Sequence, residues 1–127
     1  MTAMNLAQTA YAAPDAPTRT GRGLEYDVFA RITHRLKAAA EIGGRKGRGA
    51  LIKALYENRR LWTVLASDVA DPDNQLPAPL RARIFYLHEF TQTHSRKVLA
   101  DEATADVLIE INTAMMRGLR SDAGAGA

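Results

Sequence analysis

The chain contains no cysteine, which excludes disulfide bridges and metal sites built from thiolates. It has no apolar run approaching the roughly 20 residues that a helix needs to span a bilayer. Its N-terminal residues lack both the basic segment and the long apolar segment of a signal peptide. These absences fit a protein of the reducing cytosol. We therefore expect a cytoplasmic protein that does not insert into a membrane.

Residues with catalytic or metal-binding chemistry are also few. His88 and His94 are six positions apart, about 240° around a helix, so they cannot face one metal ion together. No serine lies in a nucleophile elbow, and no pair of carboxylates has the spacing of an acid and a base. The segment "GGRKGRG" lacks the terminal Lys–Ser/Thr of a phosphate-binding loop, and "DPDNQLPAP" lacks the distal glutamate of a calcium loop. We predict a protein that is not an enzyme and needs no metal or cofactor.

The residues that are present indicate an ordinary globular domain. The 127 residues are 46% apolar and 24% charged, which is enough for one domain with its own core. The net charge of +3 is spread unevenly, because basic side chains concentrate in residues 45–60 while residues 61–127 carry more acids than bases. A basic cluster can attract nucleic-acid phosphates, but it is more often a solvated loop and helix end.

Apolar residues recur at intervals of three and four, and nowhere do they alternate with a period of two. This pattern predicts an all-α fold, a compact bundle of four main helices over residues 24–42, 49–70, 77–100 and 104–119. A short helix can form before them. We predict a mobile N-terminal arm over 1–23, a single helical domain over 24–119 and a disordered tail over 120–127. Between the first two helices, "GGRKGRG" is predicted to be a short flexible basic loop.

The third predicted helix is apolar nearly all round. Its seam is formed by Leu80, Ile84, Leu87, Thr91, His94 and Val98. Phe85, Tyr86 and Phe90 point away from that seam. Such a helix either lies at the centre of a bundle or exposes a partner-binding face. We predict that Phe85, Tyr86 and Phe90 bind a partner, together with Arg59 at the edge of the preceding helix.

Two asparagines interrupt apolar stripes. Asn58 lies in the stripe of the second helix close to Trp62, the only tryptophan, and Asn112 lies in the stripe of the fourth. A buried amide without partners costs on the order of 1–3 kcal/mol. Either the two amides pair in the seam of the bundle and fix its register, or they line an open groove that grips an incoming helix. Trp62 is predicted to be core, and Arg60 to face solvent.

These residues also carry a family resemblance. The blocks "GLEYDVFARITHRLKAA", "ALYENRRLWTVLASDVADPDNQLPAPLRARIFYLHEFTQTHSRKVL" and "VLIEINTAMMRGL" occur in this order. Together they resemble FlaF, the flagellar biosynthesis regulator of alphaproteobacteria, from about Leu24 to Leu119.

The resemblance implies a non-enzymatic protein that is needed for filament assembly and acts after flagellin transcription. Its implied partners are flagellin, which it would accompany as a cytoplasmic secretion chaperone, and FlbT, a regulator of flagellin translation, with export components as further candidates. An alternative is direct control of flagellin mRNA through the basic segment 45–60. RNA-binding surfaces normally pair basic side chains with exposed aromatic ones, and only Tyr56 and Trp62 lie close to this segment.

Overall fold

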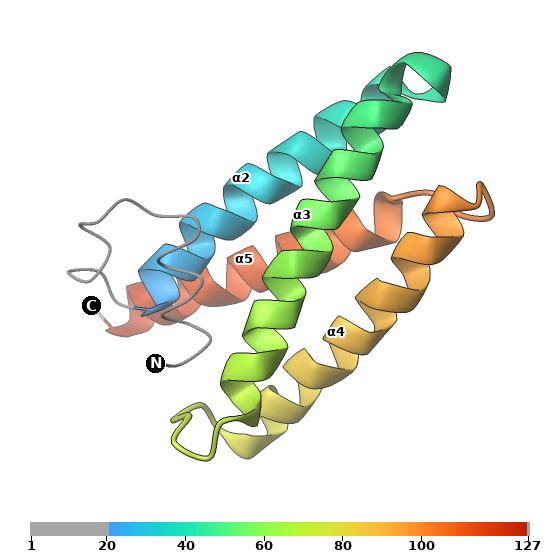
Figure 1. Ribbon diagram of the computed structural model, residues 1–127. Helices are drawn as coiled ribbons and strands as arrows, with labels where there is room; N and C mark the ends of the chain where they lie inside the picture. The colour runs from blue at the N-terminus through green and yellow to red at the C-terminus, as the bar shows by residue number, and fades with distance from the viewer. Residues whose placement is uncertain (1–20, 127) are drawn as a thin grey trace.

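The computed structural model describes residues 21–126, and the side chains of 26–118 within them. This part of the chain consists of four helices without a strand: α2 (Gly21–Ile42), α3 (Gly44–Ala70), α4 (Ala78–Leu99) and α5 (Asp106–Gly126). Helix α3 packs against both α2 and α4, and α5 packs against α2. In Figure 1, α3 runs between α2 and α4 on the near side of the bundle, and α5 lies behind it. The prediction of an all-α bundle with four main helices is confirmed.

The core of the bundle forms two apolar clusters. One contains Val28, Phe29, Ile32, Leu61, Trp62, Leu65, Val69 and Ile84. The other contains Leu36, Ala54, Leu55, Val98, Ala105 and Leu108. Members of each cluster recur at three and four positions along their helices, which is why the periodicity of the sequence predicted these helices.

The connection between α2 and α3 differs from the predicted flexible loop. Gly43 alone is not helical, with a φ of 63°, and α3 begins at Gly44. The amide of Gly43 donates to the carbonyl of Ala39, and the amide of Gly47 donates to the carbonyl of Gly43. Gly47 is buried, and a Cβ added there would lie 2.9 Å from the carbonyl oxygen of Ala39. The loop prediction was wrong because these glycines permit a tight hairpin of two helices.

We therefore expect opposite effects from alanine at two neighbouring glycines. Gly47→Ala forces a Cβ against the backbone of α2 and should lower the free energy of unfolding by about 1–3 kcal/mol. Gly49→Ala meets nothing within 4 Å and should raise it by about 0.5–1 kcal/mol, because alanine favours the helix. Urea unfolding followed by circular dichroism measures both. Equal stabilisation by the two substitutions would contradict the close approach of α2 and α3.

The segment after α3 is closed by its own polar side chains. The Asp71 carboxylate accepts from the amide of Asp73, and the Asn74 side-chain oxygen accepts from the amide of Leu76. The Asn74 side-chain amide donates to Asp68 at 3.1 Å. These bonds form the turn that joins α3 to α4, with Pro77 preceding the first residue of α4.

Helix α4 ends in a Schellman motif. The amide of Glu102 donates to the carbonyl of Lys97, and that of Asp101 donates to the carbonyl of Val98. Asp101 adopts a φ of 60° there. Arg48 of α3 donates to the Leu99 carbonyl at 2.6 Å and to the Asp101 carboxylate at 3.2 Å. This arginine therefore ties the beginning of α3 to the end of α4.

Two predicted boundaries require correction. Residues 21–23 belong to α2 and not to an arm, while the rest of the predicted arm and of the short N-terminal helix lies outside the described residues. The predicted disordered tail is wrong for 120–126, because α5 continues to Gly126. Extending an existing helix costs far less than starting one, so α5 can continue into this segment although it contains Gly124 and Gly126.

Candidate functional site

Asn58 and Asn112 meet inside the bundle. The Asn112 side-chain nitrogen donates to the Asn58 side-chain oxygen at 2.7 Å. The Asn112 oxygen in turn accepts from the indole N–H of Trp62 at 3.0 Å. All three side chains are fully buried. Of the two interpretations of these amides, the structure shows the one in which helices α3 and α5 meet polar to polar within the chain.

The asparagine pair belongs to a polar layer that separates the two apolar clusters. Its other members are buried hydroxyl groups on the remaining helices: Thr33 on α2, and Thr91 and Ser95 on α4. None of these three hydroxyls has a hydrogen-bond partner, although each lies against the core. We call Thr33, Asn58, Thr91, Ser95 and Asn112 the polar layer. Such a layer favours one register of the four helices, because a shifted register would leave the amides without each other.

The sequence pattern did not identify Thr33 and Ser95 as buried. Where these two residues lie along the long axis of the bundle depends on how neighbouring helices contact one another. Arg35 of α2 pairs with Glu57 of α3 at 2.7 Å, which places Thr33 close to the level of Asn58.

Arg59 lies on the edge of α3 that faces α4. Its Nε donates to the side-chain oxygen of Gln92 at 3.3 Å. The Gln92 amide is also within 3.4 Å of the Arg59 carbonyl and 3.3 Å of the Thr63 hydroxyl, which in turn contacts His88. Arg59 is half-buried, and the group that accepts from its guanidinium is the side-chain amide of Gln92. Arg60, the next residue, is exposed.

The three aromatic residues that we predicted to bind a partner do not form one patch. Phe85 is 44% exposed and Tyr86 is 66% exposed. Phe90 is half-buried and stacks on His94, with ring centroids 5.4 Å apart. At 100° per residue, Phe85 and Phe90 fall on opposite edges of α4. Phe85 lies on the edge next to α3, where its ring meets His88 edge-on. Tyr86 faces outward between the two.

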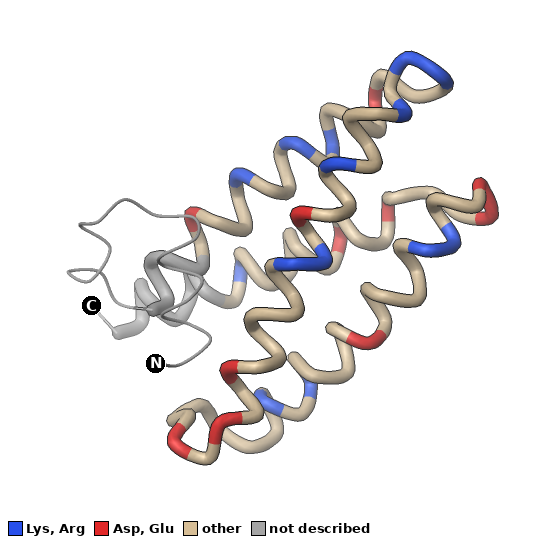
Figure 2. The backbone as a smooth tube through the Cα atoms, viewed as in Figure 1, with Lys and Arg blue, Asp and Glu red and all other residues tan. Residues whose placement is uncertain are grey.

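Basic and acidic residues concentrate in different parts of the molecule. Basic side chains are spread along α2 and the first half of α3, up to the tip where these helices join (Figure 2). Acidic side chains gather at the turn after α3 and at the turn after α4. Close to the basic region, Tyr56 is 59% exposed while Trp62 is fully buried. Of the two aromatic residues that could stack on RNA bases, only Tyr56 is therefore accessible.

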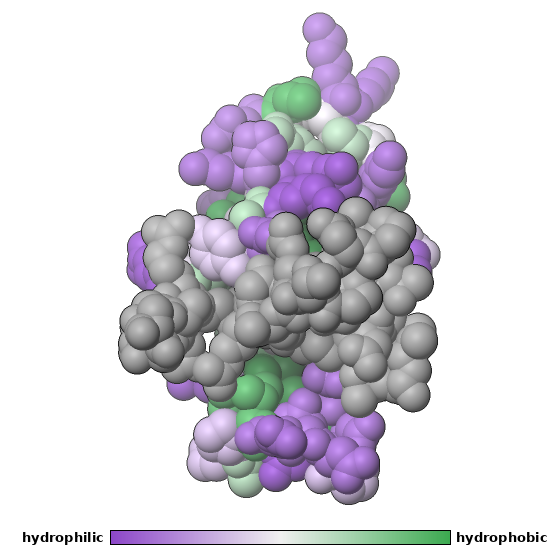
Figure 3. Space-filling model, turned by 90° about the vertical axis from the view of Figure 1, so that its left-hand side faces the viewer, coloured by the Kyte–Doolittle hydropathy of each residue, from purple (hydrophilic) through white to green (hydrophobic). Residues whose placement is uncertain are grey.

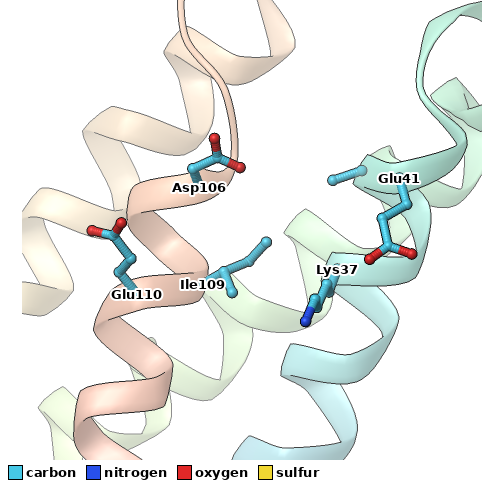
Figure 4. A pocket seen from close by; sticks show the side chains of 6 residues that line it. Lys37, Glu41, Asp106, Ile109 and Glu110 are labelled. Carbon is cyan, nitrogen blue, oxygen red and sulfur yellow. The ribbon is translucent and has the colours of Figure 1, made fainter.

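A shallow depression lies between α2 and α5 (Figure 4). Its volume is about 370 Å³, and it is lined by Lys37, Ala40, Glu41, Asp106, Ile109 and Glu110. The lining residues carry three carboxylates and one ammonium group. The depression is open to solvent, whereas ligand sites are normally enclosed. It is therefore a weaker candidate than the surface of α3 and α4.

In the part of the chain with described side chains, no three histidines or carboxylates come together in a way that could hold a metal ion. None of the described helices combines the length and apolarity required to cross a bilayer. The molecule does expose apolar surface. Figure 3 shows some of it at the end of the molecule where α3 joins α4. The fold and these surfaces define a small helical-bundle protein with exposed apolar side chains on α3 and α4.

The family model described as flagellar protein FlaF matches residues 7–119. Since this is most of the chain, the protein belongs to the FlaF family of flagellar proteins. No curated protein and no solved structure matches the chain.

Proposed function

We propose that this flagellar protein is a non-enzymatic regulator of flagellin synthesis and filament assembly, and that it acts as a cytoplasmic secretion chaperone by binding flagellin. In this proposal it holds flagellin before export, so that the supply of subunits is coupled to their secretion. FlbT and components of the export apparatus are further proposed partners.

The observation that carries the proposal is the exposed apolar surface of α4. Leu80, Phe85 and Tyr86 are each at least 36% exposed, although α4 also supplies the buried residues Ile84 and Val98. Large exposed apolar side chains that recur on one helix are typical of protein-binding surfaces. Phe85 and Tyr86 lie on different sides of α4, and an amphipathic helix of a partner can cover one of these sides.

Size-exclusion chromatography of the purified protein with purified flagellin tests the proposal. We expect the two to co-elute at micromolar concentrations, and Phe85→Asp to abolish the complex. The helical content should not change, because Phe85 lies at the surface. Ala38→Asp is a matched control, since it places the same carboxylate at an exposed position of α2, which packs on α3 and α5. Absence of co-elution with both partners folded would contradict the proposal.

Direct binding of flagellin mRNA remains the alternative. Exposed Arg45 and Lys46 favour it electrostatically, while the burial of Trp62 removes one of the aromatic side chains it would use. Phosphate contacts weaken steeply with salt, so a gel-shift assay over a salt series separates the two functions. The chaperone proposal expects no shift even at low salt.

A further inference from the structure

We infer that the outer seam between α3 and α4 binds an amphipathic helix of flagellin and that Arg59 pairs with a carboxylate of that helix. The outer seam is defined by Ile52, Tyr56, Arg59 and Thr63 of α3 with Phe85 and Gln92 of α4. This inference rests on the proposed function. It states which of the two exposed faces of α4 binds flagellin, and which chemical groups flagellin presents to that face.

The geometry of the helices brings these six residues to one surface. Ile52, Tyr56, Arg59 and Thr63 follow one another at intervals of four, three and four, so they share a face of α3. Arg59 and Thr63 both contact Gln92, which shows that this face borders α4. Phe85 lies seven positions before Gln92 and therefore on the same side of α4.

Apolar side chains stand at both ends of the outer seam. Ile52 is 45% exposed and Tyr56 is 59% exposed at one end, and Phe85 is exposed at the other. The antiparallel pairing of α3 and α4 puts Phe85 about one turn beyond the contact between Thr63 and His88. At 1.5 Å per residue the two apolar ends are then about 20 Å apart, the length of roughly four helical turns. A partner helix of this length can cover both ends with residues on one face.

The centre of the outer seam is polar and basic. Arg59 uses its Nε for Gln92, and neither of its terminal nitrogens has a hydrogen-bond partner among the described residues. Two parallel N–H donors in one plane match the two oxygens of a carboxylate. Arg96 lies one turn beyond Gln92 on the same side of α4, and Glu89 is the one acid of that row. Together with Arg59, this side therefore carries two basic residues and one acidic residue. Figure 2 shows a basic stretch midway along α3.

The occupant is specified by this arrangement of an apolar end, a cationic centre and a second apolar end. An amphipathic helix with an acidic residue near the middle of its apolar face supplies all three complementary groups. An RNA strand would match the cationic centre but would leave Ile52 and Phe85 without apolar partners. The outer seam therefore favours a protein helix.

Isothermal titration calorimetry with purified flagellin and the full chain tests the inference. We expect Arg59→Glu and Tyr56→Asp each to weaken binding by at least about tenfold, as for other central arginine and tyrosine contacts. Arg59→Lys keeps the charge but loses the planar fork, and should show a smaller loss than Arg59→Glu. The matched control for Arg59→Glu is Arg83→Glu, which makes the same charge reversal on α4 away from the outer seam. Ala38→Asp, at an exposed position of α2, is the control for Tyr56→Asp. Both controls should alter the dissociation constant by less than about twofold.

The outcomes distinguish the two proposals. If Arg83→Glu and Tyr86→Asp weaken binding while the variants at Tyr56 and Arg59 do not, flagellin binds to the other face of α4. The inference is then overturned and the chaperone function stands. If the unaltered protein binds no flagellin, both are overturned. Circular dichroism identifies a variant that fails to fold, and Tyr56→Asp keeps the test decisive because this side chain is exposed and takes no part in the Arg59–Gln92 contacts.

Discussion

Replacing Asn112 with alanine is expected to lower the free energy of unfolding by about 2–5 kcal/mol, because two buried groups lose their partners at once. The Trp62 indole N–H loses its acceptor, and the Asn58 oxygen loses its donor. Neither group can reach solvent, since both residues are fully buried. A domain of this size is typically stable by about 5–15 kcal/mol, so the loss is a large part of the total. Urea unfolding followed by circular dichroism measures it.

Two variants control for effects that do not arise from the lost hydrogen bonds. Glu110→Ala changes an exposed residue on the same helix and should shift stability by no more than about 0.5 kcal/mol. Thr91→Val lies in the polar layer but removes a hydroxyl that has no partner. It should leave stability unchanged or raise it by about 1 kcal/mol, since a buried unpaired hydroxyl is costly.

A double variant tests whether the amides act as a pair. Asn58→Ala and Asn112→Ala remove the same hydrogen bond, so their combined effect should differ from the sum of the single effects by about 0.5–3 kcal/mol. Additive effects, or a cost below about 1 kcal/mol for Asn112→Ala alone, would contradict the network described here.

The sequence alone predicted a helix wherever apolar residues recur regularly at intervals of three and four. The stripes through Leu55 and Leu65, and through Leu108 and Met115, predict the central parts of α3 and α5. It was insufficient at Gly44–Arg48, because turn residues favour a loop locally while packing favours a helix. Only the position of Ala39 and Ile42 against Gly47 explains why glycine is required there. Contacts between helices decide such segments, and a single sequence does not display them.

The polar layer was predictable only in part. Asparagine in an apolar stripe is unusual enough to suggest a buried partner, and this pointed to Asn58 and Asn112. Threonine and serine carry no such signal, because they occur on both buried and exposed faces of helices. Thr33 and Ser95 could therefore be placed only once all four helices were packed.

The candidate binding surface was also predictable from the sequence only in part. A helical wheel places Phe85 and Phe90 away from the seam of α4, but it does not show which neighbouring helix lies beside each of them. The hydrogen bonds of Arg59 and Thr63 to Gln92 supply that information, and they separate Phe85 from Phe90. The edge position of Arg59 likewise does not identify Gln92 as its partner, because the partner depends on the relative register of α3 and α4.

Trp62 is the residue whose loss should cost the most. Trp62→Ala removes the largest fully buried side chain and is expected to lower the free energy of unfolding by about 3–5 kcal/mol. The ring packs edge-on against Phe29 at a centroid distance of 5.6 Å, so the cavity opens between α2 and α3. The Asn112 oxygen also loses its indole donor. For a domain of this size, each kcal/mol corresponds to roughly 4–8 °C in Tm, so the fall should exceed about 12 °C.

Trp62→Phe separates packing from hydrogen bonding. Phenylalanine keeps an aromatic ring against Phe29 but has no N–H for Asn112, so its cost should be about 1–3 kcal/mol and below that of Trp62→Ala. Thermal unfolding must be followed by circular dichroism, because Trp62 is the only tryptophan and its fluorescence is lost in both variants. Tyr56→Ala, at an exposed aromatic residue of the same helix, should change Tm by only a few degrees. If Trp62→Phe matched Trp62→Ala, the hydrogen bond to Asn112 would dominate over packing; if it matched the unaltered protein, the polar layer would depend on the two asparagines alone.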